Sequence, residues 1–325
     1  MALLVEEPGL ASSIQDLGRP GHYNVGIPLG GAMDTLAHEI ANLLVGNERG
    51  AATVECTYTG PHLTVTAPTT MAVTGAVMDV RVNGEMVPQW TAVALDEGDS
   101  VVLGFASAGA RAYLAFAGGI DVPVVLGSRG TYGLGKIGGL QGRPLTGGDE
   151  LTLGQASSRP GVGRGLSEAS RPQYARNTES RIIWGPYDHR LIEESRELLT
   201  ASEWTLTPVA DRTGLRFNGD QKFEFVPREQ PFGAGSDPSN IVDAGYAMGS
   251  IQIPGGSQPI VLHRDAVSAG GYAMVATVIS PDLNALAQLT PGSTTRFEAV
   301  TIEEALQARK DAQAKRGRIL AELAS

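Results

Sequence analysis

Short runs of alternating or β-branched apolar residues dominate the first half of the chain. They lie at 62–67, 71–82, 91–105 and 111–118, separated by Gly, Pro, Asn and Asp. Such runs are typical of antiparallel strands joined by tight turns. Asn83 and Gly84 predict a two-residue hairpin turn after the second run, because both residues accept positive φ.

A second block of strand patterns occupies the C-terminal half. Its clearest segments are 223–226, 250–253, 260–263 and 272–279. Between the blocks, turn-forming residues are frequent and large apolar residues are few, which predicts a linker or a long crossing loop. We therefore expect a mostly β protein with a β domain at 1–155, a linker at 156–180, a β domain at 181–300 and a helix at 301–325.

Three helices are predicted among the strands. The first begins at Asp34, whose side chain can cap it, and runs to about Val45 with Leu36, Ile40 and Leu44 on one apolar face.

Capping residues also mark the other two helices. Asp188 is predicted to cap the second, which runs through Leu199. Thr301 and Glu304 have the spacing of a capping box and predict the start of the C-terminal helix.

Composition agrees with a folded protein of two domains. The chain has 325 residues, 42% of them hydrophobic, and can bury a sizeable core. Its one cysteine, Cys56, excludes an internal disulfide framework and indicates a reducing compartment. Cys56 stands in a strand-like run, so we interpret it as a buried structural thiol rather than a nucleophile.

The charge balance argues against a nucleic-acid partner. The net charge is −10, whereas affinity for nucleic acids depends on Lys and Arg that neutralise phosphates. The N-terminus lacks the basic and apolar regions of a signal peptide, and Arg111 interrupts the most apolar stretch at 101–120. We expect a soluble cytoplasmic protein without a membrane partner.

Candidate chemistry begins in a loop rich in glycine and proline at residues 13–34. Gln15, Asp16 and Arg19 lie there on a bent backbone from which polar groups can reach a ligand. The alternative is an ordinary surface connection.

A second candidate is the glycine-rich stretch at 130–142. Its start resembles the phosphate-binding pattern G-x-x-x-x-G-K-[ST], but Ile137 replaces the hydroxyl residue and the glycines that follow would break a helix. We interpret it as a flexible loop, with an anion-attracting lid carrying Lys136 and Arg143 as the alternative. Arg129 beside it could grip a carboxylate or phosphate, or hydrogen-bond backbone carbonyls to hold the loop.

The second block holds two further polar pairs. Asp211 and Arg212 could orient the amide or carboxylate of a ligand, or pin a turn. Alternation along the strand at 250–253 places Ser250 and Gln252 on one face. That face could line a barrel mouth that binds a cyclic amide or ureido group, or it could face solvent.

These segments resemble the family of allophanate hydrolase subunit 2, the biotin-dependent carboxyltransferase-like proteins, which includes KipA, the C subunit of bacterial 5-oxoprolinase and part of urea carboxylase. The resemblance begins in the loop at 13–34. It continues, in the family's order, through VGN (45–47), GPHLTV (60–65), AGGIDVPVVLGSRGTY (117–132), ADRTG (210–214), GSIQIP (249–254), PIVL (259–262), GGY (270–272) and AQLTPG (287–292). It implies two cyclophilin-like β-barrel domains with a few short helices.

The chain departs from the family's pattern Asp-x-Gln-Thr-x-Gly-Gly-Tyr-Pro. Asp265, Gly270, Gly271 and Tyr272 match it, whereas Val267, Ser268 and Ala273 stand at the Gln, Thr and Pro positions. If that glutamine binds ligand in relatives, this chain has lost a donor and an acceptor.

The residue patterns and the family resemblance together give the candidate site residues. The substrate-binding candidates are Gln15, Asp16, Arg19, Arg129, Arg212, Ser250, Gln252, Gly270, Gly271 and Tyr272. The available general acids or bases are Asp16, Asp34, Asp211 and Asp265, and the sequence does not show which pair meets in space. Of these, Asp34, Asp211 and Asp265 are the candidate catalytic residues. The five histidines are scattered, so no metal site is expected.

The resemblance implies three functions. The favoured one is a subunit of an ATP-dependent 5-oxoprolinase, which opens 5-oxo-proline to glutamate together with a KipI-like subunit and a LamB/YcsF-like subunit. The second is half of a carboxyltransferase that uses carboxybiotin carried on another chain, because this sequence has no Met-Lys-Met acceptor motif. The third is a non-catalytic KipA-type regulator that binds a kinase inhibitor. No covalently bound cofactor is expected in this chain.

Overall fold

The structure is a computed structural model that describes residues 3–156, 162–229 and 231–324. It divides into two compact units. Unit 1 comprises Met1–Pro20, Gly30–Tyr174 and Ala314–Ser325, and unit 2 comprises Gly21–Leu29 and Ala175–Gln313. The predicted domain boundaries stay a prediction, and residues 157–161 of the predicted linker lie outside the described residues.

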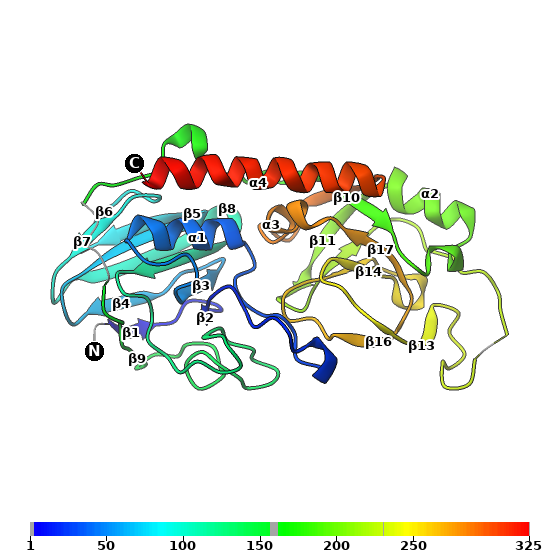
Figure 1. Ribbon diagram of the computed structural model, residues 1–325, viewed down its shortest axis with the longest axis horizontal. Helices are drawn as coiled ribbons and strands as arrows, with labels where there is room; N and C mark the ends of the chain where they lie inside the picture. The colour runs from blue at the N-terminus through cyan, green and yellow to red at the C-terminus, as the bar shows by residue number, and fades with distance from the viewer. Residues whose placement is uncertain (1–2, 157–161, 230, 325) are drawn as a thin grey trace. The chain divides into compact units, whose positions relative to one another are not determined.

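Unit 1 is built on a nine-stranded antiparallel sheet that curls into a half-barrel (Figure 1). Its main path has the order β2-β3-β8-β4-β1-β9, and β5 pairs with β6, β7 and β8. The strands are β1 Leu3–Glu7, β2 Ser13–Gln15, β3 Thr53–Thr57, β4 His62–Val65, β5 Thr69–Val82, β6 Glu85–Met86, β7 Val93–Leu95, β8 Ser100–Phe116 and β9 Glu150–Leu151, with a short 3-10 helix at Glu168–Ser170.

Alternation along β8 divides the apolar side chains of unit 1 between two cores. Leu114 and Phe116 join the core inside the curled sheet, whereas Tyr113 and Ala115 join a second core beneath helix α1, Thr35–Leu44. This is the two-residue period of a strand that is buried on both faces. Helix α1 packs against β5 and β8 (Figure 1).

Local signals placed α1 and the first hairpin correctly. The Asp34 side chain accepts a hydrogen bond from the Ala37 backbone N–H at 3.1 Å, which confirms the predicted cap. Asn83 and Gly84 have φ values of 52° and 86° and join β5 to β6. The hairpin prediction is therefore also confirmed.

Cys56 is a buried thiol of β3, as predicted. It is fully buried in the inner core of unit 1. Burial raises its pKa to about 12, so the reactive thiolate is scarce at neutral pH.

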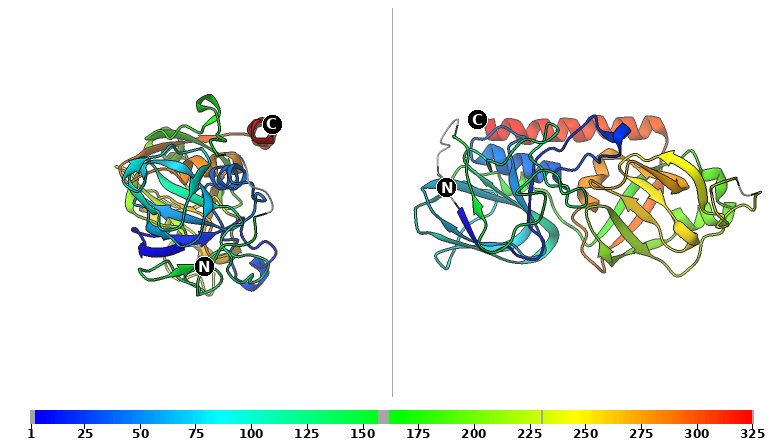
Figure 2. Two further views of the ribbon diagram at one scale, coloured as in Figure 1. Left: turned by 90° about the vertical axis from the view of Figure 1, so that its left-hand side faces the viewer. Right: turned by 90° about the horizontal axis from the view of Figure 1, so that it is seen from below.

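Unit 2 is a closed seven-stranded barrel of order β10-β17-β14-β15-β12-β11-β18, seen from below in Figure 2. A separate two-stranded sheet pairs β13 with β16. The strands are β10 Asn177–Trp184, β11 Glu203–Ala210, β12 Gly214–Asn218, β13 Asn240–Gly245, β14 Ser250–Gln252, β15 Ile260–Leu262, β16 Ala269–Tyr272, β17 Met274–Val278 and β18 Thr294–Ala299. The prediction of a mostly β protein with few short helices is confirmed.

Short helices complete unit 2. They are the 3-10 turns η1 Tyr23–Val25, η3 Asp188–Arg190, η4 Pro254–Gly256 and η5 Ser280–Asp282, and the α-helices α2 Glu193–Ala201 and α3 Leu283–Leu286. Buried Trp204 and Phe223 stack in the barrel core with ring centroids 5.2 Å apart.

The predicted cap of the second helix is wrong. Asp188 belongs to the 3-10 turn η3, and Ile192 precedes α2 without a side-chain cap. Leu191 between them is extended, because it forms a β-bridge with Phe225. The Asp188 carboxylate instead pairs with Arg196 at 3.2 Å.

The C-terminal helix α4 spans Ile302–Ala324. Its predicted capping box is confirmed, since Glu304 accepts hydrogen bonds from the backbone N–H and hydroxyl of Thr301. Near the other end, Ile319 and Leu323 are buried in the core beneath α1. None of the helices in the described part of the chain is both long and apolar enough to cross a membrane.

Candidate functional site

The first predicted loop folds against residues 128–131 through Asp16. Oδ1 of this buried carboxylate accepts hydrogen bonds from the Gly18 backbone N–H at 2.8 Å and from the Ser128 hydroxyl at 2.7 Å. Oδ2 accepts the backbone N–H of Arg129 at 2.6 Å. Asp16 therefore fixes the segment that carries Arg129.

Gln15 and Arg19 hold the same segment. Gln15 Nε2 donates to the Thr131 carbonyl at 3.1 Å, and Arg19 Nη2 donates to the Gly130 carbonyl. A side chain at position 130 would place its Cβ 2.9 Å from Asp16 Oδ1, so only glycine fits this close approach. All three predicted residues are buried, and their direct contact with a ligand stays a prediction.

The glycine-rich loop that follows consists of turns. Residues 130–142 do not form the helix that a phosphate-binding loop launches. At its end, Arg143 makes a two-pronged ion pair with Asp149, with both N···O distances at 2.7 Å. This pair lowers the pKa of Asp149, and it commits the Arg143 guanidinium to holding the loop.

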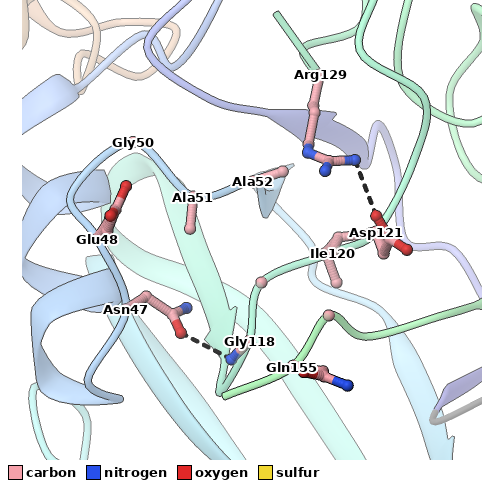
Figure 3. Close-up of a pocket in the computed structure, with 12 residues that line it drawn as sticks. Asn47, Glu48, Gly50, Ala51, Ala52, Gly118, Ile120, Asp121, Arg129 and Gln155 are labelled. Carbon is pink, nitrogen blue, oxygen red and sulfur yellow. Dashed lines mark hydrogen bonds and ion pairs between the residues drawn. The ribbon is translucent and has the colours of Figure 1, made fainter. Parts of the chain in front are cut away.

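An open pocket of about 630 Å³ lies beside Arg129 in unit 1 (Figure 3). Arg129 Nη1 donates to Asp121 Oδ1 at 3.0 Å and to the Val122 carbonyl. The lining residues are Asn47, Glu48, Gly50, Ala51, Ala52, Gly118, Gly119, Ile120, Asp121, Arg129, Gly154 and Gln155. The pocket thus combines one cation, two carboxylates and two amides.

Asn47 builds the wall of this pocket. Its Oδ1 accepts the Gly118 backbone N–H at 2.7 Å, and its Nδ2 donates to Asn42 Oδ1 at 3.0 Å and to the Phe116 carbonyl at 2.8 Å. These bonds join the end of α1 to the end of β8. They also bring two stretches of the family resemblance, 45–47 and 117–132, to one place.

Asp34 lies in a buried polar cluster that sequence reasoning missed. The Tyr113 hydroxyl donates to Glu55 Oε2 at 2.8 Å and accepts the Asp34 backbone N–H at 2.7 Å. The Tyr174 hydroxyl donates to Asp34 Oδ2 at 3.3 Å. Burial, followed by the Glu55 and Asp34 charges, raises the pKa of Tyr113 well above its usual value. Only the apolar pattern around Glu55 could have hinted at a buried carboxylate.

In unit 2, Arg212 and Asp265 form a bidentate ion pair. Nε and Nη2 of Arg212 lie 2.8 Å and 3.0 Å from the two carboxylate oxygens, and both side chains are largely buried. Asp211 turns elsewhere, because its Oδ1 accepts the backbone N–H groups of Thr213 and Gly214. Asp211 and Arg212 therefore have different roles although they are adjacent in sequence. Asp211 stabilises the turn, and Arg212 orients the carboxylate of Asp265.

Ser250 and Gln252 share one face of β14, and the solvent-facing interpretation of that face is wrong. Ser250 is fully buried and Gln252 is 5% exposed. The Ser250 hydroxyl donates to the Ala247 carbonyl at 2.6 Å. Ile251 points into the barrel core, so the polar pair lies on the outer face of the barrel beneath other side chains.

Tyr246 organises the strand that carries Gly270, Gly271 and Tyr272. Its hydroxyl accepts the Tyr272 backbone N–H at 2.7 Å and donates to the Tyr272 carbonyl at 3.0 Å. A Cβ at Gly270 would lie 3.0 Å from the Tyr246 ring, so the ring packs directly on this strand. Within the described residues, no group of three or more His, Cys, Asp or Glu side chains could hold a metal ion.

Comparisons with known proteins place these features in a family context. A family model described as carboxyltransferase domain, subdomain A and B, matches residues 25–299. The chain is 35% identical to the C subunit of Escherichia coli 5-oxoprolinase over 96% of its own length and 95% of that protein. It is 32% identical to urea amidolyase of Saccharomyces cerevisiae over 93% of its length.

The solved structure of K. lactis urea amidolyase has the same fold. It matches 98% of this chain with a TM-score of 0.90 and 30% identity, and the match covers 20% of that longer chain. The chain spans 17% of the S. cerevisiae urea amidolyase and 25% of a relative from Emericella nidulans.

Proposed function

The chain belongs to the carboxyltransferase domain family, subdomains A and B, and from that premise we propose that it acts as the C subunit of an ATP-dependent 5-oxoprolinase. The observation that carries the proposal is the match to the E. coli protein, 35% identical over 95% of its length. Nearly all of that protein therefore has a counterpart here. The reaction adds water across the lactam C–N bond of 5-oxo-proline and yields glutamate.

The proposed complex contains a KipI-like subunit and a LamB/YcsF-like subunit. ATP is consumed by the assembled complex, and the phosphate-binding pattern near residue 130 supplies no site for it in this chain. The contribution of this chain is to bind and orient a small cyclic amide. The polar group that supports this role is Arg129, at its pocket in unit 1. The Arg212–Asp265 pair of unit 2 is a separate candidate.

The candidate acids and bases differ in the groups that hold their carboxylates. Asp265 is held in place, but Arg212 engages both of its carboxylate oxygens, so a role in proton transfer requires that contact to open. In Asp34 and in Asp211, one carboxylate oxygen accepts a hydrogen bond from a backbone N–H group.

The direct test is reconstitution. The chain is co-expressed with its KipI-like and LamB/YcsF-like partners, and glutamate release from 5-oxo-proline is measured with and without ATP. We expect ATP-dependent release by the three-part complex and none by this chain alone. Folded, co-purifying subunits that release no glutamate would remove the proposal.

Carboxyl transfer is the second candidate function. The TM-score of 0.90 to the urea amidolyase structure favours it. In that case carboxybiotin would arrive on another polypeptide and the acceptor would be a urea or amide nitrogen. Avidin separates the two functions, because it should block carboxyl transfer and leave 5-oxoprolinase activity unchanged.

A further inference from the structure

Resting on the proposed function, we propose that the pocket beside Arg129 is the binding site for a small carboxylate-bearing amide. In this assignment Arg129 binds the carboxylate of the ligand. Asp121 contacts only Nη1 of the guanidinium, and the ligand binds at the opposite edge.

The backbone of Arg129 is fixed on both sides. Its N–H is held by the buried Asp16 carboxylate at 2.6 Å, and its carbonyl accepts the Gly139 N–H at 2.9 Å. Because these bonds involve the main chain, the side chain can bind a ligand without disturbing the loop. A side chain that binds a ligand is positioned most accurately when its backbone is rigid, as it is at Arg129.

One edge of the Arg129 guanidinium, formed by Nε and Nη2, is available to a ligand. Both contacts of the Arg129 side chain, to Asp121 and to the Val122 carbonyl, use Nη1. Within the described parts of the chain, Nε and Nη2 make no hydrogen bond. These two nitrogens form the edge that grips a carboxylate with two parallel hydrogen bonds. The contrast is Arg143, whose fork is already filled by Asp149.

The ion pair between Arg129 and Asp121 is weak. The side chains of Arg129 and Asp121 are 35% and 53% exposed and meet through one contact at 3.0 Å. An exposed pair of this kind contributes about 0–1 kcal/mol. The pair with Asp121 therefore does little to oppose a ligand carboxylate that binds at Nε and Nη2.

The rest of the lining recognises an amide. Glu48 and Gln155 lie on other sides of the same pocket (Figure 3). A carboxylate accepts an N–H, and a side-chain amide donates to a carbonyl oxygen. A five-membered lactam with a carboxylate presents all three groups, and so does any similar amide of an amino acid.

The kinetic test uses the assembled complex. We expect Arg129→Gln to raise KM for 5-oxo-proline about tenfold or more, because a charge-assisted bidentate contact is lost. Asp121→Asn should lower KM a few-fold, since it removes a nearby negative charge that repels the ligand carboxylate while the guanidinium stays. A purely structural ion pair predicts the opposite sign for Asp121→Asn.

A matched control pair lies elsewhere in unit 1. Arg81 and Asp79 are also exposed, at 45% and 68%, and meet at 3.7 Å. Arg81→Gln and Asp79→Asn should leave KM unchanged. Circular dichroism and urea unfolding of each variant establish that it is folded.

A binding experiment separates this inference from the proposed function. Titration of the full chain with L-5-oxo-proline, followed by ligand-observed NMR, should show binding that weakens in Arg129→Gln. Pyrrolidin-2-one, which lacks the carboxylate, should bind equally weakly to both proteins. If the complex is active and KM is unchanged in Arg129→Gln, the inference fails and the proposed function stands. If the wild-type complex is inactive, the proposed function fails and the titration decides the inference: equal or no binding by the two proteins overturns it.

Discussion

The backbone N–H of Arg129 donates a 2.6 Å hydrogen bond to Oδ2 of Asp16, a residue 113 positions earlier in the chain. The same carboxylate also accepts the hydroxyl of Ser128 and the N–H of Gly18. The two oxygens of the buried Asp16 carboxylate therefore accept three hydrogen bonds. The position of Arg129 at its pocket depends on this carboxylate.

Asp16→Asn should destabilise unit 1 and weaken substrate binding together. The amide keeps one oxygen, so at least one of the three donors faces an NH₂ group instead of an acceptor. We expect a loss of about 1–3 kcal/mol in the free energy of unfolding and a raised KM in the complex. Urea denaturation and steady-state kinetics measure the two effects, with Asp79→Asn as an exposed control. Unchanged stability would contradict the role given to the carboxylate.

Two substitutions of Asp34 separate its role as a helix cap from a role as a catalytic acid or base. Asp34→Ala removes the acceptor for the Ala37 N–H and should cost about 0.5–2 kcal/mol of stability. Asp34→Asn keeps an acceptor at the cap and should lose less than the alanine variant. A fall in kcat of the asparagine variant at preserved stability supports Asp34 as an acid or base. An unchanged kcat assigns it to the cap alone.

The Arg212–Asp265 pair should show strong coupling. Both partners are largely buried, so removing either one leaves a charge without its partner in the interior, which costs about 3–5 kcal/mol for a fully buried pair. A double-mutant cycle with Arg212→Met and Asp265→Asn should yield a coupling energy above about 1 kcal/mol. Arg212→Lys should not restore the wild-type value, because lysine cannot make the bidentate contact. Additive effects of the two substitutions would argue against a direct interaction.

The Arg143–Asp149 pair predicts a pH dependence of stability. Its hydrogen bonds lower the pKa of Asp149, so the stabilisation is complete above the usual carboxyl pKa of about 4. It is lost as the pH falls through the lower folded-state pKa. The difference in unfolding free energy between wild type and Arg143→Gln should therefore be constant from pH 7 to 5 and shrink below pH 4. A difference that grows on acidification would contradict the assignment.

Local signals predicted the elements that local chemistry builds. The Asp34 cap and the Asn83–Gly84 turn depend on backbone atoms within a few residues, and the structure contains both. The failure at Asp188 has a non-local cause, because the bridge between Leu191 and Phe225 ends the turn before the helix.

The partners of polar side chains could not be predicted in this way. Nothing near Asp16 in sequence indicates that its carboxylate binds the backbone of Arg129. Alternation placed Ser250 and Gln252 on one face, but a strand pattern does not reveal that other side chains cover this face. Glu48 and Gln155 carry no motif of their own, and only the folded backbone brings them to one pocket.

The path of the chain limits how the molecule can be divided. Residues 21–29 belong to unit 2 although their neighbours on both sides belong to unit 1, and the last residues of α4 return to unit 1. Ile319 and Leu323 there are 5% and 2% exposed against the core under α1. A fragment made by dividing the chain at one position therefore lacks part of the core of its unit. Expression of either fragment alone should give an unstable, aggregating product.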